Sequence, residues 1–145
     1  DKEAVLQRLL KNQDDIGHSI KPYYGEKAGN QLAKLLREHI LIAVKVVDAA
    51  KKGDTKALEA NNQKWYQNAN DIATFLSNAN PNWSKTELKQ MLDTHLQFVT
   101  KEVVARLKKD WKANIAAIDE GEKHMLKFAD ILANGIIEQF PNKFK

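Results

Sequence analysis

The chain has 145 residues, of which 43% are hydrophobic and 29% charged, and its formal net charge is +4. These proportions are those of an ordinary folded globular protein, so wholesale disorder is excluded. The absence of cysteine excludes disulfides, thiol nucleophiles and cysteine-ligated metal centres.

Hydrophobic periodicity and helix stop signals predict an all-α fold. We expect an antiparallel up-down helical bundle that forms a single domain over residues 1–145, with four long helices and a shorter N-terminal helix. Pro22 and Gly25 are expected to end the first helix, and residues 77–82 read as a loop. The expected helices span about residues 1–20, 26–52, 54–76, 84–108 and 110–140.

Capping residues mark several of these helix ends. Gly53 suits the left-handed position that closes a helix, and Asp54 is a good N-cap for the next one. Ser84 and Glu87 form a capping-box pattern. The join between the last two helices contains neither Gly nor Pro, and we place it at Lys109–Asp110 with Asp110 as the cap; a turn at Gly121 is the competing interpretation.

The apolar residues of the first and last helices suggest which faces are buried. On the first helix we expect an inward face made by Leu6, Leu9, Ile16 and Ile20. On the last helix the regular spacing picks out Trp111, Ile115, Ile118, Glu122, Met125, Ala129, Leu132 and Ile136.

The sequence carries an internal echo between its two halves. Residues 36–40 resemble residues 92–96, and this alignment places Asp54 opposite Asp110. The pattern suggests repeated helical hairpins, each with an outgoing helix that holds a histidine and a returning helix. On this scheme the first helix is a returning helix, and we expect its partner to precede Asp1.

Several segments resemble a family of small bacterial helical proteins that has no established activity. The segments that carry the resemblance are residues 11–17, 21–25, 38–44, 68–73 and 135–137, together with Phe140-Pro141. The resemblance covers essentially the whole chain and implies a helical fold. Family members carry a further helix upstream, which agrees with the partner helix expected before Asp1.

One polar layer is expected inside the bundle. With a rise of ~1.5 Å per residue and antiparallel neighbours, His39, His95 and the pair Glu122 and His124 fall at the same level. Such groups in an apolar seam must be hydrogen-bonded, paired or bound to metal. The layer is read first as a structural hydrogen-bonded network, and alternatively as a site for a divalent transition metal.

Basic residues gather at two helix ends. Lys51 and Lys52 end one helix, and Arg106, Lys108 and Lys109 end another. Cations are favoured at helix C-termini, so solvated helix ends are one interpretation and an anion-binding site is the other. No nucleic-acid fold signature accompanies them, and we expect no nucleic-acid partner.

The longest apolar run, residues 40–44, is far shorter than the ~20 residues of a membrane span, and no signal peptide is evident. We therefore expect a soluble protein without a membrane partner, and self-association through the exposed face of the N-terminal helix. The leading functional hypothesis is a non-catalytic binding or structural module. A metal-binding bundle comes second, and an enzyme with His95 and Glu122 as an acid–base pair comes third.

Overall fold

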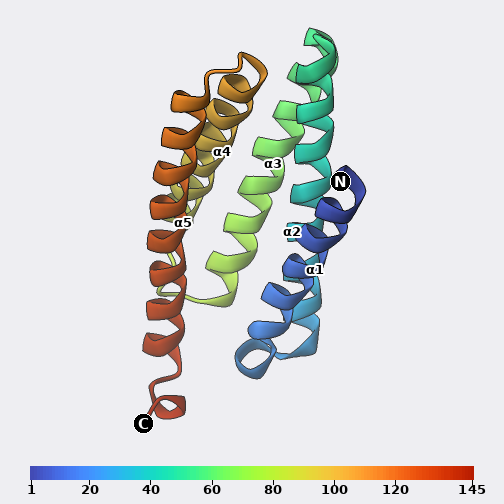
Figure 1. The fold of residues 1–145 in the computed structure, drawn as a ribbon. Helices are drawn as coiled ribbons and strands as arrows, with labels where there is room; N and C mark the ends of the chain where they lie inside the picture. The colour runs from blue at the N-terminus through green and yellow to red at the C-terminus, as the bar shows by residue number, and fades with distance from the viewer. The chain divides into compact units, whose positions relative to one another are not determined.

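The computed structural model describes all 145 residues and contains five α-helices and a short 3-10 helix, with no strand. The predicted all-α class is confirmed. The elements are α1 (Lys2–Ser19), α2 (Lys21–Lys52), α3 (Thr55–Ala79), α4 (Lys85–Leu107), α5 (Trp111–Gln139) and η1 (Pro141–Lys143) (Figure 1). No helix combines the length and the apolar character that crossing a membrane requires.

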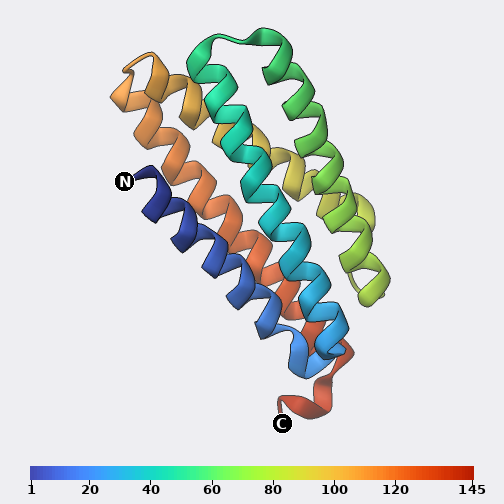
Figure 2. The same ribbon diagram turned by 90° about the vertical axis from the view of Figure 1, so that its right-hand side faces the viewer.

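The chain divides into two compact units, Asp1–Phe75 and Leu76–Lys145. The first holds α1, α2 and most of α3, and the second holds α4, α5 and η1. Each unit contains an antiparallel pair of helices in close contact, α1 with α2 and α4 with α5 (Figures 1 and 2). The single domain over residues 1–145 stays a prediction.

Glycines allow α1 and α2 to approach closely. A Cβ added to Gly17 would lie 2.6 Å from the Cβ of Ala33 and 2.6 Å from the carbonyl oxygen of Gly29. The contact therefore leaves no room for a side chain at Gly17. An ion pair between Lys2 and Asp48, 2.7 Å between Nζ and Oδ2, joins the other end of α1 to α2.

The turn between α1 and α2 is tighter than predicted. α1 ends at Ser19 and α2 begins at Lys21, with the proline in its first turn, where a missing N–H costs nothing. Gly25 then interrupts α2 with φ 83° and ψ 170°. Pro22 therefore starts a helix instead of ending one, whereas Gly25 does break the helical path as expected.

The predicted caps are confirmed. Gly53 is left-handed with φ 68°, and the Asp54 carboxylate accepts a hydrogen bond from the amide of Ala57 at 3.0 Å. The Ser84 hydroxyl accepts one from the amide of Glu87. The join between α4 and α5 lies at Lys108–Asp110, and the competing turn at Gly121 is wrong because that residue lies inside α5.

The loop between α3 and α4 begins later than predicted, because α3 continues to Ala79. Asn80 is fully buried, and its amide donates to the carbonyl of Gly135 in α5 at 2.8 Å. The indole of Trp83 lies against the same glycine, and its Nε1 donates to the carbonyl of Ile131 at 3.3 Å. These contacts fix the loop on α5.

The buried faces of α1 and α5 differ in part from the expected ones. Ile20 is buried as predicted, and four other predicted residues are half-buried, namely Leu6, Met125, Leu132 and Ile136. Leu9 and Ile16 are 43% and 40% exposed, and the buried residues of α1 are Leu10, Gln13 and Gly17. In α5 the buried residues are Asn114, Ala117, Phe128 and Gly135. Trp111, Ile115, Ile118, Glu122 and Ala129 are exposed. Small or polar residues thus share the buried faces with the large apolar residues Leu10 and Phe128.

Candidate functional site

His39 is a buried residue of the first unit and belongs to a chain of hydrogen bonds. Its Nδ1 donates to the side-chain oxygen of Asn68 at 2.7 Å, and the Asn68 amide donates to the carbonyl of Leu35 at 3.1 Å. The ring centroids of His39 and Trp65 are 5.5 Å apart. Burial lowers the pKa of the His39 imidazole below 6.5, and the Asn68 hydrogen bond opposes this shift. These hydrogen bonds join α2 to α3 around a neutral imidazole.

The hydrogen bond from Asn68 to the carbonyl of Leu35 has a counterpart in the second unit. Nε2 of His124 in α5 donates to the carbonyl of Met91 in α4 at 2.7 Å. The alignment that pairs residues 36–40 with residues 92–96 also pairs His124 with Asn68 and Met91 with Leu35. The internal echo in the sequence therefore corresponds to a repeated contact between an outgoing and a returning helix.

The turns of the two hairpins also match in this alignment. Gly53 and Lys109 both have a positive φ, 68° and 59°. Asp54 and Asp110 both cap the returning helix, and the Asp110 carboxylate accepts from the amide of Ala113 at 3.0 Å. The two hairpins, α2–α3 and α4–α5, thus share their turn geometry, whereas the close contact between α4 and α5 has no counterpart between α2 and α3.

The hairpins differ at several positions, and the exchange of Trp65 for Gly121 is the largest change in side-chain volume. Trp65, which is 2% exposed and packs against His39, corresponds to Gly121 in α5. A hollow of about 120 Å³ opens beside Gly121, where a Cβ would meet only the Cβ of Phe98, at 3.6 Å. The residues that line this Gly121 hollow are His95, Phe98, Val99, Glu102, Ala117, Ile118, Gly121, Glu122 and Met125.

The structure brings together two of the four residues of the predicted polar layer. His95 and Glu122 both line the Gly121 hollow. His124 is half-buried but does not line it, since its Nε2 is directed to the Met91 carbonyl. His39 belongs to the other unit. Neither unit holds a group of three or more His and carboxylate side chains placed to bind a metal ion, and the metal site stays a prediction.

No hydrogen-bond partner of His39 was predicted from the sequence, nor were Glu102 and Gly121 predicted as parts of the hollow. A signal for Gly121 was present, because the internal echo aligns it with Trp65. A glycine opposite a buried indole in the repeat indicates that the two hairpins pack differently at this place.

The predicted basic residues are all exposed. Lys51 and Lys52 end α2 in the first unit, and Arg106, Lys108 and Lys109 close α4 in the second. The guanidinium of Arg106 lies 5.6 Å from the ring centroid of Trp111, which is itself 56% exposed. These positions fit either solvated helix ends or an anion site, and the anion site stays a prediction.

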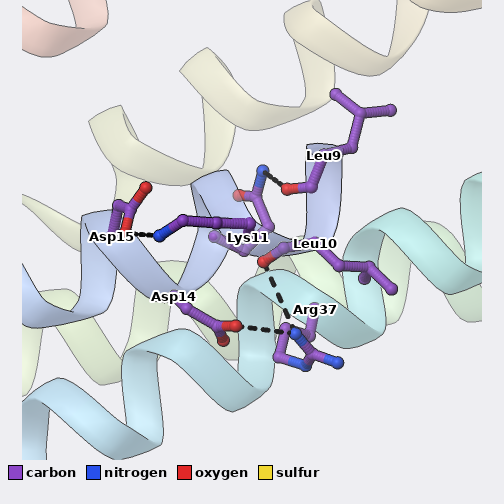
Figure 3. A network of polar contacts seen from close by, with 7 residues as sticks. Leu9, Leu10, Lys11, Asp14, Asp15 and Arg37 are labelled. Carbon is purple, nitrogen blue, oxygen red and sulfur yellow. Dashed lines mark hydrogen bonds and ion pairs between the residues drawn. The ribbon is translucent and has the colours of Figure 1, made fainter. Parts of the chain in front are cut away.

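A hollow of about 440 Å³ lies on the α1–α2 pair. Its charged residues satisfy one another: the Arg37 guanidinium donates to the Asp14 carboxylate at 2.9 Å and to the carbonyl of Leu10 at 3.5 Å (Figure 3). Lys34 and Glu38, which also line it, form an ion pair within α2 at 4.0 Å. This hollow is therefore a helix-pair groove bridged by the Arg37–Asp14 ion pair.

Comparisons with family models, with curated proteins and with solved structures give no match to this chain. The candidate site is therefore defined by its own geometry, as the hollow beside Gly121 with His95 and Glu122 on its walls.

Proposed function

We propose that this protein is a non-catalytic binding module and that the α4–α5 hairpin is the element that binds. The observation that carries the proposal is the contrast between the two hairpins. Both keep the same cross-helix hydrogen bond, but Trp65 fills the first and Gly121 leaves a hollow in the second. A hairpin that keeps this hydrogen bond and has glycine where the other hairpin has an indole has the form of a scaffold that accepts a ligand.

The hydrogen bonds of the histidines support a binding function over a catalytic one. His39 and His124 each donate to a neighbouring helix, so these two imidazoles hold helices together. Only His95 and Glu122 of the predicted layer face the hollow. Catalysis by this pair is the third hypothesis, because acid–base work needs a further group that positions the reacting atoms.

A fragment titration followed by nuclear magnetic resonance tests the proposal. We expect some members of a small-fragment library to shift the amide signals of residues around Gly121, and we expect the variant Gly121→Trp to abolish these shifts. Ala133→Trp, an exposed substitution in the same helix, is the matched control and should retain them. A library without any fragment that shifts α4 or α5 signals would contradict the binding function.

A transition-metal site is the second candidate, supported by His95 and Glu122 sharing one hollow. If it is correct, purified protein binds Zn²⁺ or Mn²⁺ stoichiometrically, and the ion raises the melting temperature of wild type but not of His95→Ala. His18→Ala, on an exposed histidine of α1, is the control. A protein that binds no metal, and whose melting temperature is the same with and without added ions, would contradict this candidate.

Self-association is supported by an apolar strip on α1, where Val5, Leu9 and Ile16 are 56%, 43% and 40% exposed. We expect a concentration-dependent sedimentation coefficient that Leu9→Glu removes. Gln7→Glu, an exposed neighbour outside the strip, is the control. A wild-type coefficient that is independent of concentration rejects self-association.

A further inference from the structure

We infer that the Gly121 hollow binds a small aromatic cation, a single ring that carries an ammonium group one or two atoms away. This inference rests on the proposed binding function and names its ligand class. Two features of the hollow carry it: an apolar space that suits one ring, and carboxylates that stand where the other hairpin has uncharged residues.

The space suits a ring because of its walls and its volume. Phe98, Val99, Ile118 and Met125 supply apolar surface, including an aromatic ring and a thioether, both of which pack well against rings. The hollow has a volume of about 120 Å³ and opens to solvent beside Ile118 and Glu122, which are exposed. The hollow therefore accommodates one ring.

In the other hairpin, the corresponding place is occupied by an aromatic side chain. In the α2–α3 hairpin the chain supplies the ring itself, since Trp65 packs 5.5 Å from His39 between ring centroids. His95 is the counterpart of His39 and lines the hollow beside Gly121. A ligand ring in the hollow would take the place beside His95 that the indole takes beside His39.

The charges in the hollow point to a cation. Glu102 and Glu122 line it, and in the alignment of the two hairpins their counterparts are Val46 and Tyr66. The hairpin with Gly121 thus has carboxylates at two positions where the hairpin with Trp65 has uncharged residues. Glu122 is exposed, so its side chain is accessible to a ligand from solvent. Lys101, whose ammonium lies 5.2 Å from the Phe98 ring centroid, lines a different hollow.

The test compares three one-ring probes of similar size and different charge: benzylammonium, benzyl alcohol and benzoate. Each is titrated into the full chain and followed by the amide signals of α4 and α5. We expect benzylammonium to bind about fivefold tighter than benzyl alcohol at low salt, the gain of one exposed ion pair, and benzoate to bind weakest. The advantage over benzyl alcohol should shrink as salt is added.

Variants assign the binding to the hollow. Gly121→Trp should abolish binding of all three probes, and Glu122→Gln and Glu102→Gln should remove the preference for benzylammonium. Glu120→Gln, an exposed α5 carboxylate that lines the other hollow, should leave the preference unchanged. Because Gly121→Trp could disturb the fold, its melting temperature is measured, and Gly121→Leu serves as a second filling variant.

The outcomes separate the ligand class from the binding function. Equal affinities for benzylammonium and benzyl alcohol, or a preference that survives both glutamine variants, overturn the inference while the hollow remains a binding site. Failure of all three probes also overturns it, whereas the proposed function fails only when no fragment of any class binds the hairpin.

Discussion

Gly17 of α1 and Gly29 of α2 lie in backbone contact, such that a Cβ on Gly17 would stand 2.6 Å from the Gly29 carbonyl oxygen. Real Cβ atoms do not approach a backbone oxygen so closely, and neither partner can yield without moving a helix. The α1–α2 contact therefore depends on the absence of two side chains.

The first prediction is that Gly17→Ala destabilises the protein by about 1–3 kcal/mol, because overpacking outweighs the gain in helix propensity. Gly121→Ala is the matched control, since its Cβ meets only Phe98, at 3.6 Å. The control should be stabilised by up to about 1 kcal/mol. Urea unfolding measures both, and a Gly17→Ala variant as stable as Gly121→Ala would show that the helices separate freely.

The second prediction concerns the loop between α3 and α4. Asn80→Ala should cost about 2 kcal/mol, because it removes hydrogen bonds to the Gly135 carbonyl and from the Asn82 amide in a fully buried place. Asn78→Ala, on an exposed residue two positions earlier, should change stability by less than about 0.5 kcal/mol. Similar losses in the two variants would mean that the loop is not fixed on α5.

The third prediction concerns His39 and pH. Because burial lowers its pKa in the folded state, the unfolded chain binds the proton more readily, and acid favours unfolding. The contribution of His39 should be constant above pH 6.5 and fall below it, at most by about 1.4 kcal/mol per pH unit.

The measurement for His39 is the free energy of unfolding of wild type and of His39→Gln between pH 8 and pH 5. We expect wild type to be more stable at pH 8 and its advantage to shrink as the pH falls. Curves that stay parallel over this range would show that His39 is not held neutral by the fold.

The fourth prediction concerns Lys109, which has φ 59° where the other hairpin has Gly53. A non-glycine residue in the left-handed region is strained, so Lys109→Gly should stabilise the protein by about 1 kcal/mol. The neighbouring Lys108→Gly should destabilise it by about 0.5–1 kcal/mol, since Lys108 has a helical φ of −80°. Thermal melts of the two variants that shift in the same direction would contradict this assignment.

The helix ends were predictable because they depend on contacts within a few residues. Asp54, Ser84 and Asp110 each accept a hydrogen bond from an amide three positions later, and Gly53 takes the left-handed conformation that closes a helix. Such contacts are written in the local sequence. The start of α2 was not predicted correctly from Pro22, because a proline fits the first turn of a helix as well as it breaks the interior of one.

The buried faces were not predictable from periodicity alone, because α1 and α5 each offer two neighbouring faces with apolar character. The pattern favoured the larger side chains Leu9, Ile16 and Ile115, which are exposed. The structure buries Gly17 and Gly135 in their place, since small residues allow the close approach of Ala33 and Trp83. Which face a helix buries is set by the shape of its partner.

The sequence by itself determined an all-α chain, its helix caps and an internal repeat of the helical hairpin, because these follow from local hydrogen bonding and from periodicity. It also placed His95 and Glu122 at one level, which the hollow beside Gly121 agrees with. Only the tertiary structure decided that His124 donates to the carbonyl of Met91 and that His39 donates to the side chain of Asn68. It also decided that a hollow lies beside Gly121. Those outcomes depend on how side chains from different helices fill a shared volume.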